Sequence, residues 1–185
     1  MKPMRIAHIS ATFPPYESGA GRVCYQNAVG LAARGHEVHV YTAGSPADEI
    51  ATQPDTLHIH RLKPLVQIGN APLLPSLLTL KRVDVAHMHL PFIFGAELIW
   101  LASVLRGIPY VVTYHNDLIG DGARARLFDL YMRWAMPLSL RRARKIGAVT
   151  LDHAQHSRAA GEFKRRGAAL VEIPNGVDSA HFAPD

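Results

Sequence analysis

Short apolar runs alternate with longer helix-periodic segments along the whole chain. The runs that predict strands lie at residues 6–9, 37–42, 57–62, 83–90, 109–114, 145–150 and 169–173. Most of them are continuously apolar or β-branched, which is typical of strands buried on both faces of a parallel sheet. The run at 57–62 alternates apolar and polar residues, and this pattern favours an outer strand with one wetter face.

The segments between the runs have the period of helices. A helix is predicted at residues 23–33, because the residues on one of its faces are apolar or small: Cys24, Ala28, Leu31 and Ala32. Further helices are predicted at 95–105, 123–143 and 152–166, with a short one at 76–81. Residues 45–55 are polar and predict a loop, and residues 63–75, with three prolines and a glycine, predict an irregular, mobile segment.

The helix predicted at 123–143 has two notable features. Pro137 should kink or divide it, because proline lacks the amide hydrogen that a helix needs. Its large apolar residues fall on one side: Leu127, Leu130, Tyr131, Trp134 and Leu138. The basic residues along or beside it are expected on its solvated side: Arg124, Arg126, Arg133, Arg141, Arg142, Arg144 and Lys145. The alternative is a surface for anionic lipid or a phosphorylated acceptor.

Strands alternating with helices predict an α/β fold, a Rossmann-like doubly wound parallel sheet of about seven strands with right-handed crossovers. Ligands of such sheets bind beyond the carboxyl ends of the strands, where the strand order reverses. The segment 11–22, His89 and His115 are therefore expected around one crevice.

Composition describes an ordinary globular protein of 185 residues, with 48% apolar and 19% charged residues. The one cysteine, Cys24, excludes an internal disulfide framework and is compatible with a reducing cytosol. No secretory signal is visible, and the most apolar stretch, 90–105, is too short to span a bilayer and contains Glu97. The net charge of +5 permits contact with phosphates or anionic lipid without proving either.

Gly19 and Gly21 follow the first strand and precede the first helix. A helix start offers free amide groups and a partial positive charge, and glycine lets a ligand approach the backbone closely, so this stretch could hold an anion. The alternative is a tight turn that needs small residues only for packing. The G-x-G spacing lacks the third glycine of the dinucleotide fingerprint.

Histidines occur in two H-x-H pairs, His58 with His60 and His87 with His89. Each pair shares a strand face and could supply two metal ligands, but no further ligand is tied to either pair by spacing, so no metal is expected. His115 is more informative, because it stands where the fifth strand ends and a ligand-facing residue would lie. The alternative for His115 is an ordinary histidine satisfied at a strand end.

The order of several motifs resembles one known family. The motifs are PPYESGAGR after the first strand, RGHEVHVYT at 34–42, VDVAHMHLP at 83–91, TYHN at 113–116 and IPNGVDSAHFAP at 173–184. This series is similar to the N-terminal half of the retaining glycosyltransferases of family 4, which have the GT-B fold. The resemblance covers nearly the whole chain.

The resemblance implies two Rossmann-like domains that face a cleft, the first binding the acceptor and the second most of the nucleotide-sugar donor. It places Gly21 near the donor diphosphate, with Gly19 shaping the loop, and His115 as the catalytic residue at the donor sugar. Asn116 and His89 would stand on the acceptor side, and Asn175 and Gly176 would begin the interdomain hinge. Ala20 departs from the adjacent glycine pair that is common in the family, and Asn116 from an aspartate.

The sequence thus predicts an acceptor-side domain at residues 1–174 and the start of a linker at 175–185, with the C-terminal donor-binding domain absent. The enzyme would be cytoplasmic, use no metal or cofactor, and transfer sugar from a nucleotide-sugar donor to an unidentified acceptor. The isolated chain should be inactive, since positioning both substrates is most of the catalysis. The enzyme could also contact the inner membrane face peripherally and self-associate through the exposed cleft, and it is not expected to bind nucleic acid.

Two alternatives remain open. The chain could be a non-catalytic binding subunit that completes its cleft with a separate chain, and the mass of the native product would separate this from truncation. It could also be a Rossmann-like NAD(P)-binding protein, although the third glycine is absent and the second strand ends at Tyr41 and Thr42 without an acidic residue for a ribose.

Overall fold

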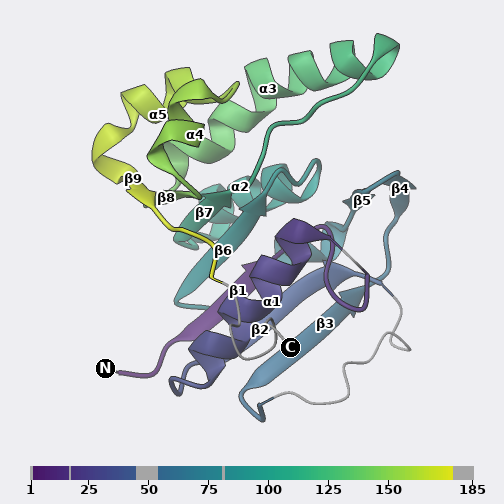
Figure 1. Ribbon diagram of the computed structural model, residues 1–185. Helices are drawn as coiled ribbons and strands as arrows, with labels where there is room; N and C mark the ends of the chain where they lie inside the picture. The colour runs from purple at the N-terminus through teal and green to yellow at the C-terminus, as the bar shows by residue number, and fades with distance from the viewer. Residues whose placement is uncertain (1, 17, 45–53, 81, 177–185) are drawn as a thin grey trace, which may run out of the picture.

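The fold is organised around one parallel sheet. The computed structural model describes residues 2–16, 18–44, 54–80 and 82–176. Within them, the strands of the main sheet stand in the order β3-β2-β1-β6-β7-β8-β9 (Figure 1). Their bounds are β1 Arg5–Ile9, β2 Glu37–Ala43, β3 Leu57–Leu62, β6 Val85–Leu90, β7 Tyr110–Tyr114, β8 Ile146–Ala148 and β9 Leu170–Glu172. All neighbouring pairs are parallel, so the predicted seven-stranded Rossmann-like sheet is confirmed.

The strand order reverses between β1 and β6. From β1 the chain proceeds outward through β2 to β3, and it then returns to β6 on the other side of β1. The carboxyl ends of β1 and β6 therefore border the crevice in which ligands of this architecture bind.

The core has one apolar cluster on each face of the sheet. On one face, α1 (Gly19–Ala32) packs Cys24, Ala28 and Ala32 against Val38 and Val40 of β2. On the other face, a larger cluster joins the 3-10 helix η1 (Pro75–Thr79), α2 (Gly95–Arg106) and α3 (Gly122–Arg142) to the sheet. Along the strands, residues of this larger cluster alternate with residues that face α1, so both faces of the sheet are covered and excluded from water.

α3 is not divided at Pro137. It runs unbroken through Pro137 along one side of the molecule (Figure 1). The carbonyl to which Pro137 cannot donate is that of Arg133, an exposed residue.

The apolar side predicted for α3 is mostly solvent-facing, not a core face. Tyr131 is buried, but the others are 42–65% exposed: Leu127, Leu130, Trp134 and Leu138. The sheet is contacted instead by the neighbouring stripe of the helix, which includes Met132, Met136 and Leu140.

The helix predicted at 152–166 is two helices, α4 (Leu151–His156) and α5 (Ala160–Arg165). The break lies at Ser157, whose backbone is extended. The next amide, that of Arg158, donates to both carboxylate oxygens of Asp117 at 3.1 and 3.0 Å. This charge-assisted contact replaces the helical hydrogen bond that Arg158 would otherwise make.

The segment 63–75 was predicted to be irregular, but it holds an antiparallel hairpin. Its strands are β4 (Val66–Ile68) and β5 (Ala71–Leu73), joined by Gly69 and Asn70. Gly69 has φ +59°, the left-handed conformation that a two-residue hairpin turn requires at its first position. The short helix predicted at 76–81 is η1, a 3-10 helix of five residues.

Two predictions fall partly outside the described residues. The linker at 175–185 is described only at Asn175 and Gly176, and the loop at 45–55 only at its last two residues. Among the helices of the described part, none combines the length and apolarity that crossing a bilayer requires.

Candidate functional site at the carboxyl edge of the sheet

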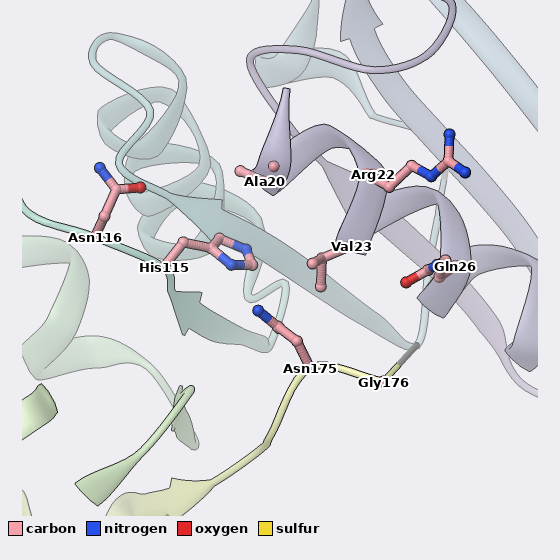
Figure 2. A pocket seen from close by; sticks show the side chains of 9 residues that line it. Ala20, Arg22, Val23, Gln26, His115, Asn116, Asn175 and Gly176 are labelled. Atoms are coloured by element: carbon pink, nitrogen blue, oxygen red, sulfur yellow. The ribbon is translucent and has the colours of Figure 1, made fainter. Parts of the chain in front are cut away.

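An open pocket of about 410 Å³ lies at the carboxyl edge of the sheet. Three chain segments line it: the first turns of α1, the end of β7, and the segment after β9 (Figure 2). The lining residues are Gly19, Ala20, Arg22, Val23, Gln26, His115, Asn116, Asn175 and Gly176. The structure thus gathers five of the predicted site residues into one place.

The first turn of α1 forms one wall of the pocket. The helix starts at Gly19, four residues earlier than predicted, because the Ser18 hydroxyl caps it by accepting from the Gly21 amide at 3.0 Å. The first hydrogen bond inside the helix runs from the Arg22 amide to the Ser18 carbonyl, so the amides of Gly19 and Ala20 have no intrahelical partner. Gly19 and Gly21 belong to this turn and not to the loop in which they were predicted.

The two glycines have different surroundings. Gly19 lines the pocket, and a Cβ built on it would meet nothing within 4 Å. Gly21 is buried and outside the lining, and a Cβ there would stand 2.7 Å from Ser18 Oγ and 2.8 Å from the Thr12 carbonyl oxygen. Gly21 therefore lets α1 pack closely against the preceding loop, which is the packing alternative weighed for this stretch.

His115 stands opposite α1. It follows β7 directly, and its amide donates to the Leu90 carbonyl at 2.9 Å, which extends the sheet pairing by one residue. Its Nε2 lies 2.9 Å from His89 Nδ1. Burial lowers the pKa of His115 to about 4, so the imidazole is neutral at pH 7.

His89 lies behind His115 and does not line the pocket. It is 1% exposed and shares the α1 face of the sheet with His8 and His87. His89 Nε2 lies 3.0 Å from His8 Nδ1, and His87 Nε2 lies 2.7 Å from Thr113 Oγ1. Any influence of His89 on a ligand would pass through His115.

Hydrogen bonds of the charged residues Asp117 and Arg158 hold the loop that follows His115. Asp117 accepts from the Tyr114 hydroxyl and from the Arg158 amide, and the Arg158 guanidinium donates to the Leu118 carbonyl at 3.0 Å. Asn116 is exposed at the pocket, and its side-chain amide donates to the Asp117 carbonyl at 2.9 Å. Asp117 thus anchors the loop that presents Asn116.

The segment after β9 closes the third side. It leaves the far edge of the sheet and returns to the pocket, where the Asn175 side chain points toward His115 (Figure 2). Arg22 and Gln26 complete the opposite rim, with the Arg22 guanidinium directed away from His115 (Figure 2). These two residues were not predicted. If Ser18 had been identified as the helix cap, their positions one and two helical turns after it would have indicated that they lie beside the pocket.

Two groups in the described ranges bring three potential metal ligands within 4.8 Å of one another: His8, His87 and His89, and Glu37, His39 and His58. In the first group, both nitrogens of His89 already face other imidazoles. In the second, Glu37 is paired with Arg5 at 2.9 Å and with His39 at 3.1 Å. His89 and Glu37 thus already have hydrogen-bond or ion-pair partners within the protein.

The sequence pattern that defines Glycosyltransferase Family 4 matches residues 18–181. The chain belongs to this family. The matched range contains the α1 wall, His115 and Asn175, so the pocket lies within the part that identifies this family 4 glycosyltransferase domain. A comparison with curated protein sequences finds no match.

Solved structures agree on the fold of this family 4 domain. The Anabaena protein HepE, solved in complex with UDP and glucose, superposes with a TM-score of 0.62 at 17% identity, over 96% of this chain and 46% of its own. A glycosyltransferase from Rickettsia africae gives 0.63 at 16% identity, over 100% of this chain and 46% of its own. The domain therefore has the Rossmann-like architecture of GT-B glycosyltransferases and spans about half the length of these relatives.

Proposed function

We propose that the domain is the acceptor-side half of a retaining glycosyltransferase, which transfers a sugar from a nucleotide-sugar donor to an acceptor hydroxyl. The observation that carries the proposal is the pocket, where a helix N-terminus faces a neutral histidine within a family 4 domain. The solved complex of HepE with UDP and glucose supports the donor class.

Each wall of the pocket suits one part of the reaction. The amides of Gly19 and Ala20 suit a diphosphate, because a helix N-terminus carries a partial positive charge. His115 would bind the donor sugar, and Asn116 would contact the acceptor. We assign Gly21 and His89 indirect roles, since Gly21 sets the position of the α1 turn and His89 holds His115.

The pocket is open on one side and would be completed by a second domain. We propose that a donor-binding domain completes it, joined after Gly176 or supplied by another chain, with Asn175 and Gly176 as the hinge. Alone, the domain would bind donor weakly and transfer no sugar, because aligning both substrates is most of the catalysis. Its uncovered pocket is also the surface through which copies would associate. We place the enzyme in the cytoplasm and assign the charge stabilisation to protein groups, with no metal.

A specific observation favours a membrane-bound acceptor. Leu127, Leu130, Trp134 and Leu138 form an exposed apolar stripe on α3. Arg124, Arg126 and Arg133 are exposed on the same helix, whereas Arg141 pairs with Glu162 and Arg142 donates to Ser103; its one acidic residue, Asp129, pairs with Arg158. Apolar side chains flanked by arginines are complementary to an anionic bilayer surface. We propose that α3 rests on the cytoplasmic leaflet and holds the pocket near a lipid-linked or lipid acceptor.

The donor assignment can be tested on the domain itself. UDP-, GDP- and ADP-sugars would be titrated into ¹⁵N-labelled protein, with NAD⁺ as the competing ligand class. We expect millimolar binding, with amide shifts confined to Gly19, Ala20, His115 and Asn116. Preference for NAD⁺, or donor-induced shifts away from this pocket, would overturn the proposal. Micromolar affinity or transfer by the domain alone would contradict the need for a second domain.

A further inference from the structure

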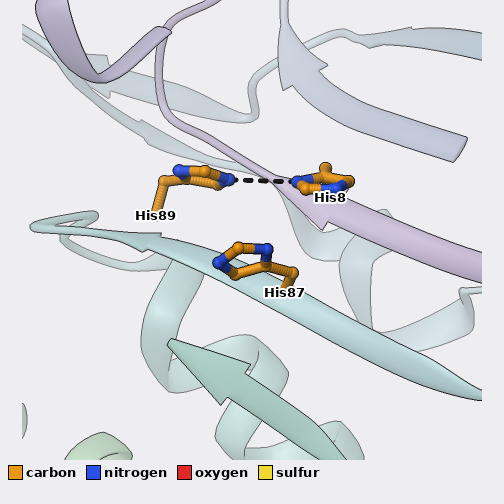
Figure 3. Close-up of side chains that lie close together, drawn as sticks. All are labelled: His8, His87 and His89. Atoms are coloured by element: carbon orange, nitrogen blue, oxygen red, sulfur yellow. Dashed lines mark hydrogen bonds between the residues drawn. The ribbon is translucent and has the colours of Figure 1, made fainter. Parts of the chain in front are cut away.

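Three imidazoles form a continuous chain from the core to the pocket. His8 Nδ1 lies 3.0 Å from His89 Nε2, a contact drawn as the dashed line in Figure 3. His89 Nδ1 lies 2.9 Å from His115 Nε2. The order follows from the sheet, because β1, β6 and β7 are neighbours and place these side chains in successive positions on its α1 face. Only the last member, His115, reaches the pocket.

The chain is built from neutral rings. His8 and His89 are 0% and 1% exposed, and burial lowers the pKa of both well below the ordinary value. Their other close ring neighbour, His87, is half-buried, and burial lowers its pKa to about 4. Each ring therefore carries one proton, on one of its two nitrogens.

Counting protons leaves two arrangements. Each of the two N···N contacts needs one donor and one bare nitrogen. If His8 is protonated on Nδ1, His89 must be protonated on Nδ1, and His115 likewise. If His8 is protonated on Nε2, both of the others must be protonated on Nε2. The tautomer of His115 is thus tied to that of His8, two residues away along the chain of hydrogen bonds.

The buried end of the chain distinguishes the two arrangements. His8 Nε2 has no hydrogen-bond partner among the described residues. In the Nε2-protonated arrangement this atom would be a buried donor with nothing to bind, and buried N–H groups without a partner are rarer in proteins than acceptors without one. The Nδ1-protonated arrangement leaves a bare nitrogen there, and it places the Nδ1–H of His115 at the pocket.

We propose that His8 and His89 are positioning residues that fix His115 as a neutral Nδ1–H donor toward the pocket. The inference deepens the proposed function, on which its choice of ligand rests. A fixed N–H group suits a hydroxyl oxygen of the sugar or an ester oxygen of the nucleotide-sugar. Successive hydrogen bonds along the chain of imidazoles strengthen one another. The same arrangement excludes His115 as the base that deprotonates the acceptor, because its bare nitrogen already accepts from His89.

The tautomers can be measured on the unliganded 185-residue chain labelled with ¹⁵N-histidine. Two-bond ¹H–¹⁵N correlation spectra show which ring nitrogen carries the proton. We expect His8, His89 and His115 each to be Nδ1–H at neutral pH, with about a tenfold or larger excess over the other form. This readout needs no sugar transfer, so its failure would leave the proposed function standing, and the donor titration can fail independently.

Matched variants test the coupling. His8→Phe removes the first donor, and His115 should then populate both tautomers. His8→Asn places an amide near the position of Nδ1 and should restore the single Nδ1–H form. His87→Phe is the control, because His87 is on the same face but bonds to Thr113 outside the chain. If His8→Phe fails to fold, the wild-type spectrum and His8→Asn still decide the matter.

Three results would overturn the inference. These are an Nε2–H tautomer for His115 in the wild type, a single tautomer that survives His8→Phe unchanged, and a positively charged ring in the chain at neutral pH. Stoichiometric zinc binding that is lost in His87→Phe would also contradict it, because the same nitrogens would then serve as metal ligands.

Discussion

His115 combines two demands that oppose each other. The imidazole of His115 is neutral at pH 7, since its partial burial at the strand end lowers its pKa to about 4. A residue that must meet a ligand cannot be fully covered either, and His115 is only partly buried at the pocket. Its contact with His89 lets it remain neutral, oriented and reachable.

Removal of the His115 ring should therefore impair catalysis more than folding. In an enzyme that contains this domain, we expect His115→Ala to lower kcat/KM by about 10²-fold or more. The control is His156→Ala, whose side chain is 75% exposed on α4. Circular dichroism of both variants would confirm the fold, and full activity of His115→Ala would remove His115 from the mechanism.

The two glycines of the α1 turn should respond differently to the same methyl group. Gly21→Ala should destabilise the domain by about 1–3 kcal/mol, because its Cβ would stand 2.8 Å from the Thr12 carbonyl oxygen. Gly19→Ala should leave the stability nearly unchanged but weaken donor binding, because its methyl group enters the pocket rim. Urea unfolding and donor titration measure the two effects, and equal stability losses would contradict this division of roles.

Acid should destabilise the domain through histidines whose pKa values are lowered in the folded state. His87 and His115 have folded-state pKa values of about 4, below the value of about 6.5 of an unfolded chain. Between these values the unfolded state binds more protons, so stability is fully present above pH 6.5 and falls as the pH drops through 4.

The measurement is the free energy of unfolding in urea between about pH 7 and pH 4. His87→Phe should flatten the profile, whereas His156→Phe, at an exposed position, should not. Lowered carboxylate pKa values, such as that of Glu162 beside Arg141, act at the acidic end and are common to all variants. A wild-type profile without slope between pH 6.5 and 4 would show that these histidines are not neutral in the folded state.

At the scale of elements, the sequence predicted what depends on local pattern. Most strands of the main sheet were found from apolar runs, because a strand buried on both faces has few polar residues, and β3 was found from its alternating pattern. The buried stripe of α3 was missed, because periodicity shows that apolar residues share a side but not which side meets the sheet. The hairpin was missed because its prolines outweighed the Gly69–Asn70 turn.

In the site too, residues marked by local sequence pattern were predicted, and contacts that depend on the folded chain were not. His115, Asn116 and Asn175 were found because strand ends and family motifs mark them. The imidazole chain could not be predicted, because His8 meets His89 only once β6 has returned to pair with β1, 81 residues later along the sequence. Gly21 illustrates the limit of a motif, which shows that a glycine is needed but not what it must approach.

The α3 stripe should bind anionic bilayers. We expect the domain to sediment with vesicles rich in phosphatidylglycerol and not with phosphatidylcholine alone. Trp134→Gln with Leu130→Gln should reduce binding about tenfold, and Arg126→Gln with Arg133→Gln should reduce it in a salt-dependent manner. Both pairs are exposed, so stability should change little.

The matched control is Leu105→Gln, whose side chain on α2 is 70% exposed but lies outside the stripe. An equal effect of this control would indicate non-specific adsorption. Loss of a dimer in the Trp134 variant, without any vesicle binding by the wild type, would assign the stripe to a protein contact.

At the scale of the whole molecule, one sheet carries both apolar clusters, so the domain should unfold as one unit. Strand β2 contributes Val38 and Val40 to the cluster beneath α1 and Tyr41 to the larger cluster on the other face. Near- and far-ultraviolet circular dichroism should show the same urea midpoint. Separate transitions would mean that the α1 layer detaches first. Sedimentation velocity over a range of concentrations would show whether the open pocket side associates.

Cys24 makes the α1 layer observable by chemistry. It is the one thiol of the chain, it is 0% exposed, and burial raises the pKa of its thiol. A thiol reagent can therefore reach it only when α1 lifts from the sheet. The first turn of the same helix forms a wall of the pocket, so the labelling rate reports how often that wall is displaced from the sheet. A ligand seated at Gly19 and Ala20 would slow that rate by the factor by which it stabilises the closed form.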